Sequence, residues 1–329
     1  MLARMAIGSF VSVGRSLSDA MARVALAEDL GYDAAYVTHI AGRDSLTLLA
    51  AYAAATSRIG LGTGVVPIYT RTPATMAMTA ATLHEQSGGR LRLGLGVSHR
   101  GVVEAWHGQT IDKPVAEMRE YVAILRAILA GEPPPAGEKW QTSFALSGIG
   151  PYPDLPIYVA ALSPAMLRLA GEIADGAMLW LCNPEYIRAV VVPELQAGRE
   201  RAGKTMDGFE VVAAVPSAVV EDPATAFASM RRDLLTYFGL PFYRAMLERS
   251  GFGEDIAAYD EAAARGDGEA MQAAISERFL RALCAIGSPE EVRAGVARYD
   301  EAGANAPCVG PIARTDFEGT LRAAAPAPG

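Results

Sequence analysis

The chain has 329 residues, of which 51% are hydrophobic and 20% are charged. This composition supplies ample material for the core of a globular protein. The formal net charge of −8 argues against nucleic acid as the main partner. No run of about 18 apolar residues is present, so neither a membrane-spanning helix nor a membrane partner is expected.

The cysteines and the N-terminal sequence bear on the cellular compartment. Cys182, Cys284 and Cys308 are widely spaced and odd in number, which predicts reduced thiols with no disulfide framework and no zinc site. The segment "MLARMAIGSF" lacks the long apolar stretch and the cleavage site of a secretory signal. A cytoplasmic location is therefore expected.

Short apolar segments alternate with longer helical patterns along the chain. Strands are predicted at residues 4–10, 33–38, 58–65, 90–97, 156–161, 175–181, 209–219 and 305–311. Helices are predicted at residues 18–30, 44–56, 73–86, 114–130, 163–174, 184–202 and 288–303. The strands are apolar on both faces, as in a parallel sheet that helices cover on both sides.

Five helix starts share one local signal, a capping side chain followed by proline. They are Thr72-Pro73, Ser163-Pro164, Asn183-Pro184, Asp222-Pro223 and Ser288-Pro289. The side-chain oxygen accepts from a free amide of the first turn, and proline at the first helical position loses no hydrogen bond. Ser288 and Glu291 also predict a capping box. Eight strands followed by such helices predict a (β/α)8 TIM barrel, with an open doubly wound sheet as the alternative.

Two segments do not fit this alternation. Residues 131–155 are rich in proline and glycine, and residues 222–286 are much longer than one helix. The second segment follows the seventh strand, so it is predicted to add helices over the open end of the barrel. There it would be a lid or pocket wall, or else a packing or dimerisation appendage. The whole prediction is one domain over residues 1–320, followed by a disordered tail at 321–329.

Reactive groups of a barrel gather where its strands end. The predicted strand ends carry Thr38–His39, Gly64–Val65, Val97–His99, Ala161–Ser163, Cys182–Asn183 and Ser217. His39 and His99 are catalytic candidates, because imidazole acts as acid, base or hydrogen-bond donor near neutral pH. The alternative is a histidine satisfied by a backbone carbonyl. No metal site is expected, since neither an HExxH motif nor clustered carboxylates accompany these histidines, and GxSxG and phosphate-loop motifs are absent.

Glycines interrupt two of the predicted strands, in "GLGTGVV" at residues 60–66 and "LGLG" at residues 93–96. We expect Gly62 and Gly94 to permit close packing inside the barrel. Gly64 and Gly96 lie nearer the open end, where the absence of a side chain would let a flat ligand approach. Ser163, at a helix start, is either a phosphate contact or a simple cap.

Three ordered motifs resemble one known family. They are "TSRIGLGTGVVPIYTRTPATMAMTAATLHEQSGGRLRLGLGVSH" at residues 56–99, "PIYVAALSPAMLRLAGEIADGAMLW" at 156–180 and "GSPEEVRAGVARYDEAGAN" at 287–305. The chain resembles the bacterial luciferase-like flavin/deazaflavin oxidoreductases. It is most similar to the branch that uses coenzyme F-420, such as methylenetetrahydromethanopterin reductase. The resemblance implies a (β/α)8 barrel with a reduced-flavin-type cofactor in its open end.

The resemblance also implies the site, residue by residue. It places a non-prolyl cis peptide between Gly64 and Val65, behind the deazaflavin ring, and His39 beside the ring next to Thr38. The end of the fourth strand would touch the cofactor, and the turn after the fifth would lie near its ribityl chain and phosphate. These two stretches are Gly96, Val97 and Ser98, and Ala160, Ala161, Leu162 and Ser163.

The chain departs from the family pattern at two of these points. The phosphate turn is often glycine-rich, whereas this chain has "AALSP". Ser98-His99 stand where some deazaflavin enzymes have glutamate, which disfavours a sugar-phosphate dehydrogenase. The anionic coenzyme requires a basic patch, for which the candidates are Arg43, Arg71, Arg100 and Arg168. An apolar pocket is expected from Tyr69, Trp106, Trp180 and Phe238.

The function implied is hydride transfer between reduced deazaflavin and an activated C=C, C=N or carbonyl group of a small organic substrate. His39, or His99, would supply or remove the matching proton. The alternative is a two-component monooxygenase that uses reduced FMN and oxygen. A cofactor-free binding protein on the same scaffold is a third possibility. The family also implies a homodimer formed through barrel helices.

Overall fold

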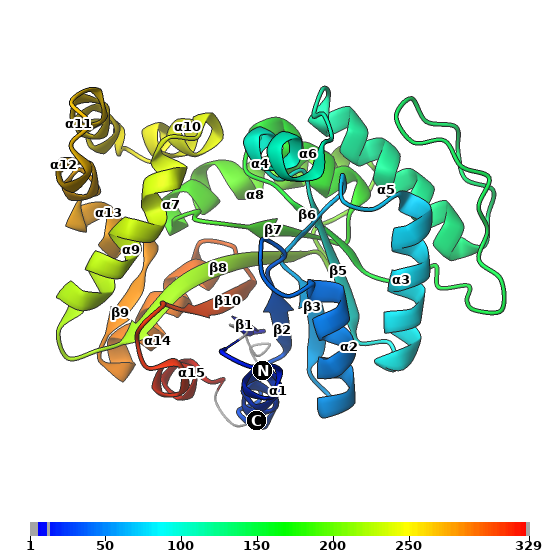
Figure 1. The fold of residues 1–329 in the computed structure, drawn as a ribbon, viewed down its shortest axis with the longest axis horizontal. Coiled ribbons are helices and arrows are strands. Elements are labelled where there is room, and N and C mark those ends of the chain that lie inside the picture. Colours follow the sequence, from blue (N-terminus) through cyan, green and yellow to red (C-terminus); the bar gives the residue numbers. More distant parts are fainter. Residues whose placement is uncertain (1–5, 12–13, 327–329) are drawn as a thin grey trace.

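Parallel strands close into a barrel in the computed structural model of the chain, which describes residues 6–11 and 14–326. The eight barrel strands in these residues are β1 (Gly8–Phe10), β2 (Ala34–Val37), β3 (Gly60–Thr63), β5 (Leu91–Gly96), β6 (Ile157–Ala160), β7 (Gly176–Leu179), β8 (Glu210–Val219) and β10 (Ala306–Pro311). The barrel closes because β10 pairs in parallel with both β1 and β8. The (β/α)8 TIM barrel is confirmed (Figure 1).

Two short strands lie beside this closed set. β4 (Val66–Pro67) continues the course of β3 and pairs with the end of β5. β9 (Ala285–Gly287) pairs with the end of β8, where Ser217 faces Ala285. β9 was not predicted. Residues 4–5 of the first predicted strand lie outside the described residues.

Helices surround the barrel in the predicted order. They are α1 (Leu17–Asp29), α2 (Ser45–Ala55), α3 (Pro73–Gln86), α5 (Pro114–Ala130), α6 (Pro164–Ile173), α8 (Val192–Arg201) and α14 (Pro289–Glu301). Each predicted proline start has its side-chain cap, and Ser288 forms the predicted box with Glu291. These starts are local in origin, since each cap joins residues two or three positions apart.

The predicted helix at residues 184–202 is divided. A short helix, α7 (Pro184–Tyr186), is followed by a π-helical turn over Ile187–Val191 and then by α8. The amide of Val192 donates to the carbonyl of Ile187, five residues earlier. Pro193 has no amide hydrogen to continue the regular ladder, which accounts for the change of winding at this point.

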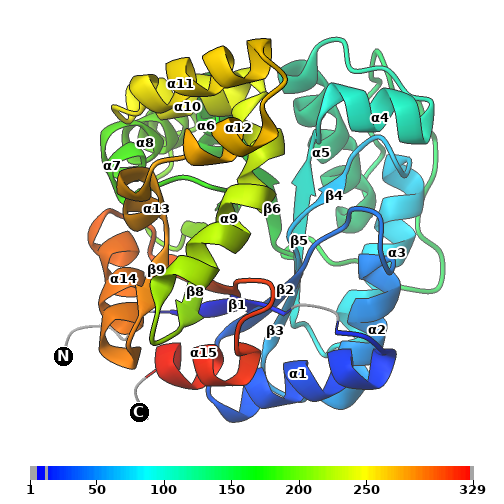
Figure 2. The ribbon, with the colours of Figure 1, turned by 60° about the vertical axis from the view of Figure 1, so that its left-hand side comes forward.

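The segment 222–286 forms five helices in the described residues, and they reach the C-terminal end of the barrel. They are α9 (Pro223–Phe238), α10 (Pro241–Arg249), α11 (Gly253–Ala264), α12 (Gly268–Ala273) and α13 (Glu277–Leu283). Figure 2 shows α10–α12 at the upper left and α4 (Arg100–His107), which was not predicted, at the upper right. Because α4 follows the end of β5, this upper end is the C-terminal, open end.

The last helix corrects one prediction. α15 spans Phe317–Ala324 and buries Leu321, Ala323 and Ala324. The expected disordered tail is therefore wrong for residues 321–324, while residues 327–329 lie outside the described part. The hydroxyl of Tyr32 donates to the carbonyl of Leu321 at 2.8 Å. This contact joins the two ends of the sequence, so no local pattern could reveal it.

Glycines make room for large side chains inside the barrel. A Cβ on Gly62 would lie 2.5 Å from the ring of Tyr36, and one on Gly176 would overlap the ring of Tyr158. A Cβ on Gly94 would overlap the carbonyl oxygen of Thr63. The prediction that Gly62 and Gly94 serve close packing is confirmed.

Candidate active site

The predicted site residues gather on one half of the open end. Thr38 and His39 follow β2, Gly64 and Val65 follow β3, and the remaining stretches end β5 and β6. These four strands are neighbours in the barrel. A Cβ on Gly96 would lie 2.6 Å from Cγ2 of Val65 and 3.4 Å from Cβ of Ala160. The fold therefore brings three of the predicted stretches into direct contact.

The peptide bond between Gly64 and Val65 is cis and non-prolyl, as the resemblance implied. The chain bulges here, because Gly62 pairs with Arg92 while Val66 pairs with Leu95. From Gly62 to Val66 the chain advances four residues, whereas from Arg92 to Leu95 it advances three. The segment that joins β3 to β4 therefore contains one extra residue.

The glycines at this end pack against neighbouring side chains. A Cβ on Gly64 would lie 2.5 Å from the ring of Phe10, and the space beside Gly96 is filled by Val65. Close packing therefore accounts for Gly64 and Gly96 as well as for Gly62 and Gly94. Cofactor contact at Gly64 and Gly96 stays a prediction, and it would have to run through backbone or through Val65.

His39 is held by the start of α2. Its Nδ1 lies 3.0 Å from Oγ of Ser45, and the amide of Ser45 donates to the same Nδ1 at 3.4 Å. An amide can only donate, so Nδ1 is an acceptor and the proton of a neutral ring sits on Nε2. Nε2 has no hydrogen-bond partner within the described residues. The alternative expectation, that a backbone carbonyl would accept a hydrogen bond from the His39 ring, is not what the structure shows.

Burial, more than the neighbouring charges, keeps His39 neutral near pH 7. Burial lowers the pKa of His39, Asp44 raises it, and Arg71 lowers it again. Burial works against ionisation of Asp44 too, but hydrogen bonds from Thr47 and Arg71 outweigh it and lower the pKa of Asp44 to about 2. Arg71 lies 2.6 Å from Asp44, so its charge is already engaged.

The other three arginines proposed for a basic patch are engaged as well. Arg100 pairs with Glu104 at 2.9 Å and Arg168 with Glu194 at 2.5 Å. Arg43 donates to the backbone carbonyl of Arg15 at 3.1 Å. An anionic coenzyme tail would have to compete for these groups, and the basic patch stays a prediction.

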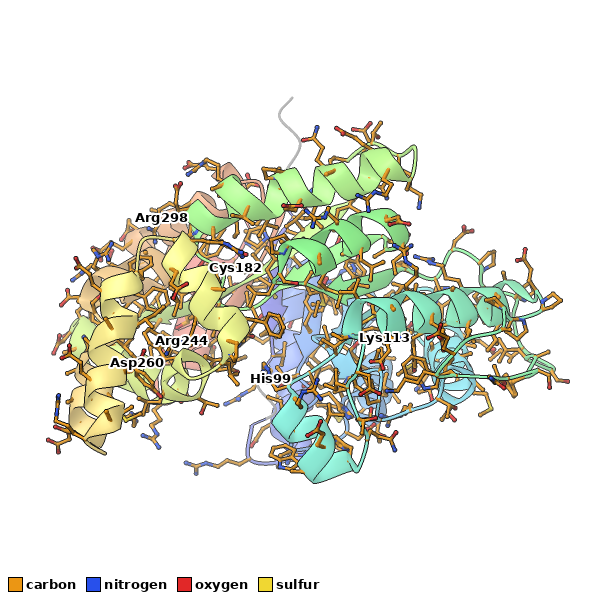
Figure 3. The ribbon with its side chains drawn as sticks, turned by 90° about the horizontal axis from the view of Figure 1, so that it is seen from above. His99, Lys113, Cys182, Arg244, Asp260 and Arg298 are labelled. Atoms are coloured by element: carbon orange, nitrogen blue, oxygen red, sulfur yellow. The ribbon has the colours of Figure 1, made fainter. Side chains whose placement is uncertain are left out.

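His99 faces the inserted helices. Its ring centroid lies 5.9 Å from that of Tyr243 on α10 and 6.3 Å from that of Tyr237 on α9. Burial lowers the pKa of His99. Figure 3, which looks down on the open end, shows His99 between α4 and these helices. These contacts support the pocket-wall interpretation of residues 222–286.

A cavity of about 260 Å³ opens on the other half of the barrel end. Its walls come from β1, β2, β7, β8, β10 and α9. Of the predicted cofactor residues in the described chain, Thr38 alone lines it. Trp180 lines it as predicted, whereas Tyr69 and Phe238 are buried in the main core and Trp106 is exposed.

Sequence reasoning missed several residues of this cavity, among them Leu181, Asp233 and Tyr237. Leu181 and Ser98 each have φ of 58° although neither is glycine, and each follows a barrel strand. Such backbone is uncommon and clusters at functional sites. Leu181 lay inside the predicted strand 175–181, whereas the observed strand ends at Leu179, so no sequence signal pointed to it.

A family model described as luciferase-like monooxygenase matches residues 1–306. The chain belongs to the luciferase-like family. Within the described residues of this luciferase-like chain, no cluster of histidine, cysteine, aspartate or glutamate could hold a metal ion. Nor does any helix in that part have the length and apolar character needed to cross a membrane.

Named relatives share most of its length. A Mycobacterium tuberculosis protein, named as a coenzyme F-420-dependent oxidoreductase, is 32% identical over 85% of this chain and 87% of its own. The 5,10-methylenetetrahydromethanopterin reductase of Archaeoglobus fulgidus is 31% identical over 85% of each chain. The F-420-dependent tetrahydromethanopterin reductase of Methanopyrus kandleri superposes with a TM-score of 0.81 at 25% identity, over 98% of this chain and 97% of its own. This luciferase-like protein is an oxidoreductase enzyme.

The polar groups at the ends of β2 and β5 fit a flavin or deazaflavin. The side chains of Thr38 and Ser98 form no hydrogen bond within the described residues, and Nε2 of His39 is a free donor. A flavin-type ring has a polar edge that needs such partners. Ser163 caps α6, because its hydroxyl accepts a hydrogen bond from the amide of Met166 at 3.4 Å. Of the two roles predicted for Ser163, the structure thus contains the helix cap.

The two half-buried histidines predict a pH dependence of stability. Burial lowers the pKa of His39 and of His99, so the unfolded chain binds more protons than the folded chain once the pH falls below about 6.5. The free energy of unfolding should therefore not depend on these histidines above this pH, and it should fall as the pH is lowered below it. Urea unfolding between about pH 7.5 and about pH 5.5 should show a flatter dependence for the double variant His39→Asn/His99→Asn. Equal slopes for the variant and the parent would contradict this.

Proposed function

We propose that this enzyme uses coenzyme F-420 and transfers a hydride between the reduced deazaflavin and an activated C=C, C=N or carbonyl group of a small organic substrate. The observation that carries the proposal is the hydrogen bonding of His39 at Nδ1, which leaves the proton on Nε2 without a partner in the described residues. The amide of Gly64 donates to the carbonyl of Val37 at 2.8 Å, which sets the bulge next to Thr38 and His39. The names of the F-420-dependent relatives support the choice of cofactor.

When bound, the coenzyme would supply the hydride-carrying carbon. The chain's residues would do the rest. Thr38 and Ser98 would hold the polar edge of the ring, and Val65 would offer an apolar surface to one of its faces. His39 would hold a proton at Nε2 and donate a hydrogen bond to the substrate oxygen or nitrogen on which negative charge develops. Because its pKa is lowered, His39 does this as a neutral imidazole near pH 7.

Direct binding tests the cofactor. The purified full chain should quench the fluorescence of oxidised F-420 with a dissociation constant in the micromolar range, and it should bind FMN more weakly. Thr38→Val, which keeps the shape but removes the hydroxyl, should weaken F-420 binding about tenfold. The exposed helical threonine variant Thr82→Val is the matched control and should bind as the parent does.

The family name leaves the FMN-dependent monooxygenase as the second candidate. Tighter binding of FMN than of F-420, together with oxygen consumption in the presence of reduced FMN, would replace the proposal with this candidate. Failure to bind either compound at micromolar concentration would instead favour a cofactor-free binding protein. The homodimer and the cytoplasmic location stay predictions.

A further inference from the structure

The cavity meets the proposed cofactor residues at Thr38, extends from there over the other half of the barrel end, and has mainly apolar walls. Its apolar lining includes Phe10, Trp180, Leu181, Met230 and Leu234. An engineered cavity of about 150 Å³ holds benzene, so this larger space of about 260 Å³ accommodates one ring with a short chain. The body of a molecule bound here must be apolar.

One helix supplies a charge to this apolar surface. Met230, Asp233, Leu234 and Tyr237 of α9 line the cavity at positions i, i+3, i+4 and i+7, the spacing of one helix face. A stripe of this kind is ordinarily apolar throughout. Asp233 departs from that pattern.

The carboxylate of Asp233 is not committed to a partner. It forms no hydrogen bond and no ion pair in the described part of the chain. Its side chain lines the cavity but is exposed to solvent. Partial desolvation raises the pKa of Asp233, while the charges of Arg232 and Arg314 lower it. Among the described residues that line the cavity, Asp233 carries the one formal charge, since the other polar side-chain groups are neutral hydroxyls and the indole N–H of Trp180.

The aromatic walls favour the same sign of ligand charge. The rings of Phe10 and Trp180 both line the cavity and meet edge to face, with centroids 5.8 Å apart. Trp180 is 38% exposed, so part of its indole is open to a ligand. The face of an indole attracts a cation, and a carboxylate attracts it more strongly.

We propose that this cavity binds a small molecule with an apolar ring or chain and a cationic nitrogen, which pairs with Asp233. The assignment of the cavity to the substrate rests on the proposed function, because that function gives the opposite half to the cofactor. Among the reducible groups considered above, the pairing favours substrates in which the C=N group or a neighbouring amine is protonated.

Calorimetric titration of the full chain with two probes of similar shape tests the pairing. Benzylammonium carries the charge, and benzyl alcohol does not. The parent should bind benzylammonium about tenfold more tightly than benzyl alcohol. Asp233→Asn should abolish that preference, and Arg314→Gln should increase it by removing a competing cation. Asp29→Asn, which removes an equal charge at the far end of α1, should leave it unchanged.

Equal affinities for the two probes would overturn the proposal, as would a preference that survives Asp233→Asn or failure of both probes to bind at millimolar concentration. F-420 binding is measured separately. A charge preference that depends on Asp233, in a chain that does not bind F-420, would reject the proposed function and retain the cation site. The opposite pattern would reject the cation site and leave the proposed function intact.

Discussion

His39→Ala is expected to lower kcat by about 10²–10⁴-fold, the range that general acid–base groups contribute. The variant removes the free proton on Nε2, and the hydroxyl of Thr38 beside it is not an acid–base group near neutral pH. Cofactor affinity should change much less, because Thr38 and Ser98 keep their hydroxyls. Turnover is followed through the absorbance of the oxidised deazaflavin, with a substrate selected from small iminium, enone and carbonyl compounds.

His84→Ala is the matched control for this experiment. His84 is also a half-buried histidine whose pKa is lowered by burial, but it lies on α3 against Tyr152, away from the open end. Its removal should leave kcat within about twofold of the parent, since it touches none of the proposed site. Undiminished kcat in His39→Ala would remove His39 from the mechanism.

Ser45→Ala separates the position of His39 from its presence. The substitution removes the hydroxyl 3.0 Å from Nδ1 but keeps the amide that donates to the same atom. The proton should therefore stay on Nε2, and kcat should fall by about tenfold or less. A loss as large as that of His39→Ala would show that the hydroxyl, and not the amide, fixes the ring.

Gly94→Ala is expected to destabilise the fold by about 3 kcal/mol, the upper range for overpacking. The new Cβ would overlap the carbonyl oxygen of Thr63 and lie 2.6 Å from Sδ of Met178. The strands cannot easily separate, since Thr63 Oγ1 both donates to and accepts from the backbone of Gly94, at 2.8 and 2.9 Å. Urea denaturation measures the change.

Gly101→Ala is the control for the stability experiment. Gly101 lies within α4, and a Cβ there meets nothing within 4 Å. Alanine should stabilise the chain by about 0.5–1 kcal/mol, because it restricts the unfolded state and suits a helix. If Gly94→Ala were as stable as the parent, the close contact between β3 and β5 would be wrong.

Local patterns in the sequence determined the order of strands and helices. A cap such as Ser288 with Glu291 joins residues three positions apart, and an apolar strand such as β8 is continuous in sequence. Both are fixed by neighbours along the chain. His39 was singled out by its position at the end of a predicted strand. The family resemblance added the cis bond at Gly64–Val65 and the place of His39 beside the cofactor ring, because a signature fixes positions that periodicity cannot.

Tertiary structure alone decided what each of these residues contacts. Gly64 packs against Phe10 of another strand, and Arg71 is engaged by Asp44, 27 residues earlier. Nothing in the sequence around Asp233 distinguishes it from other charged residues on helices, and only the packing of α9 against the barrel shows that it lines the cavity. Likewise, α15 is held by contacts such as that of Tyr32 with Leu321, 289 positions away. A short sequence window encodes backbone hydrogen bonds and caps, whereas burial and charge pairing depend on residues that only the closed barrel brings together.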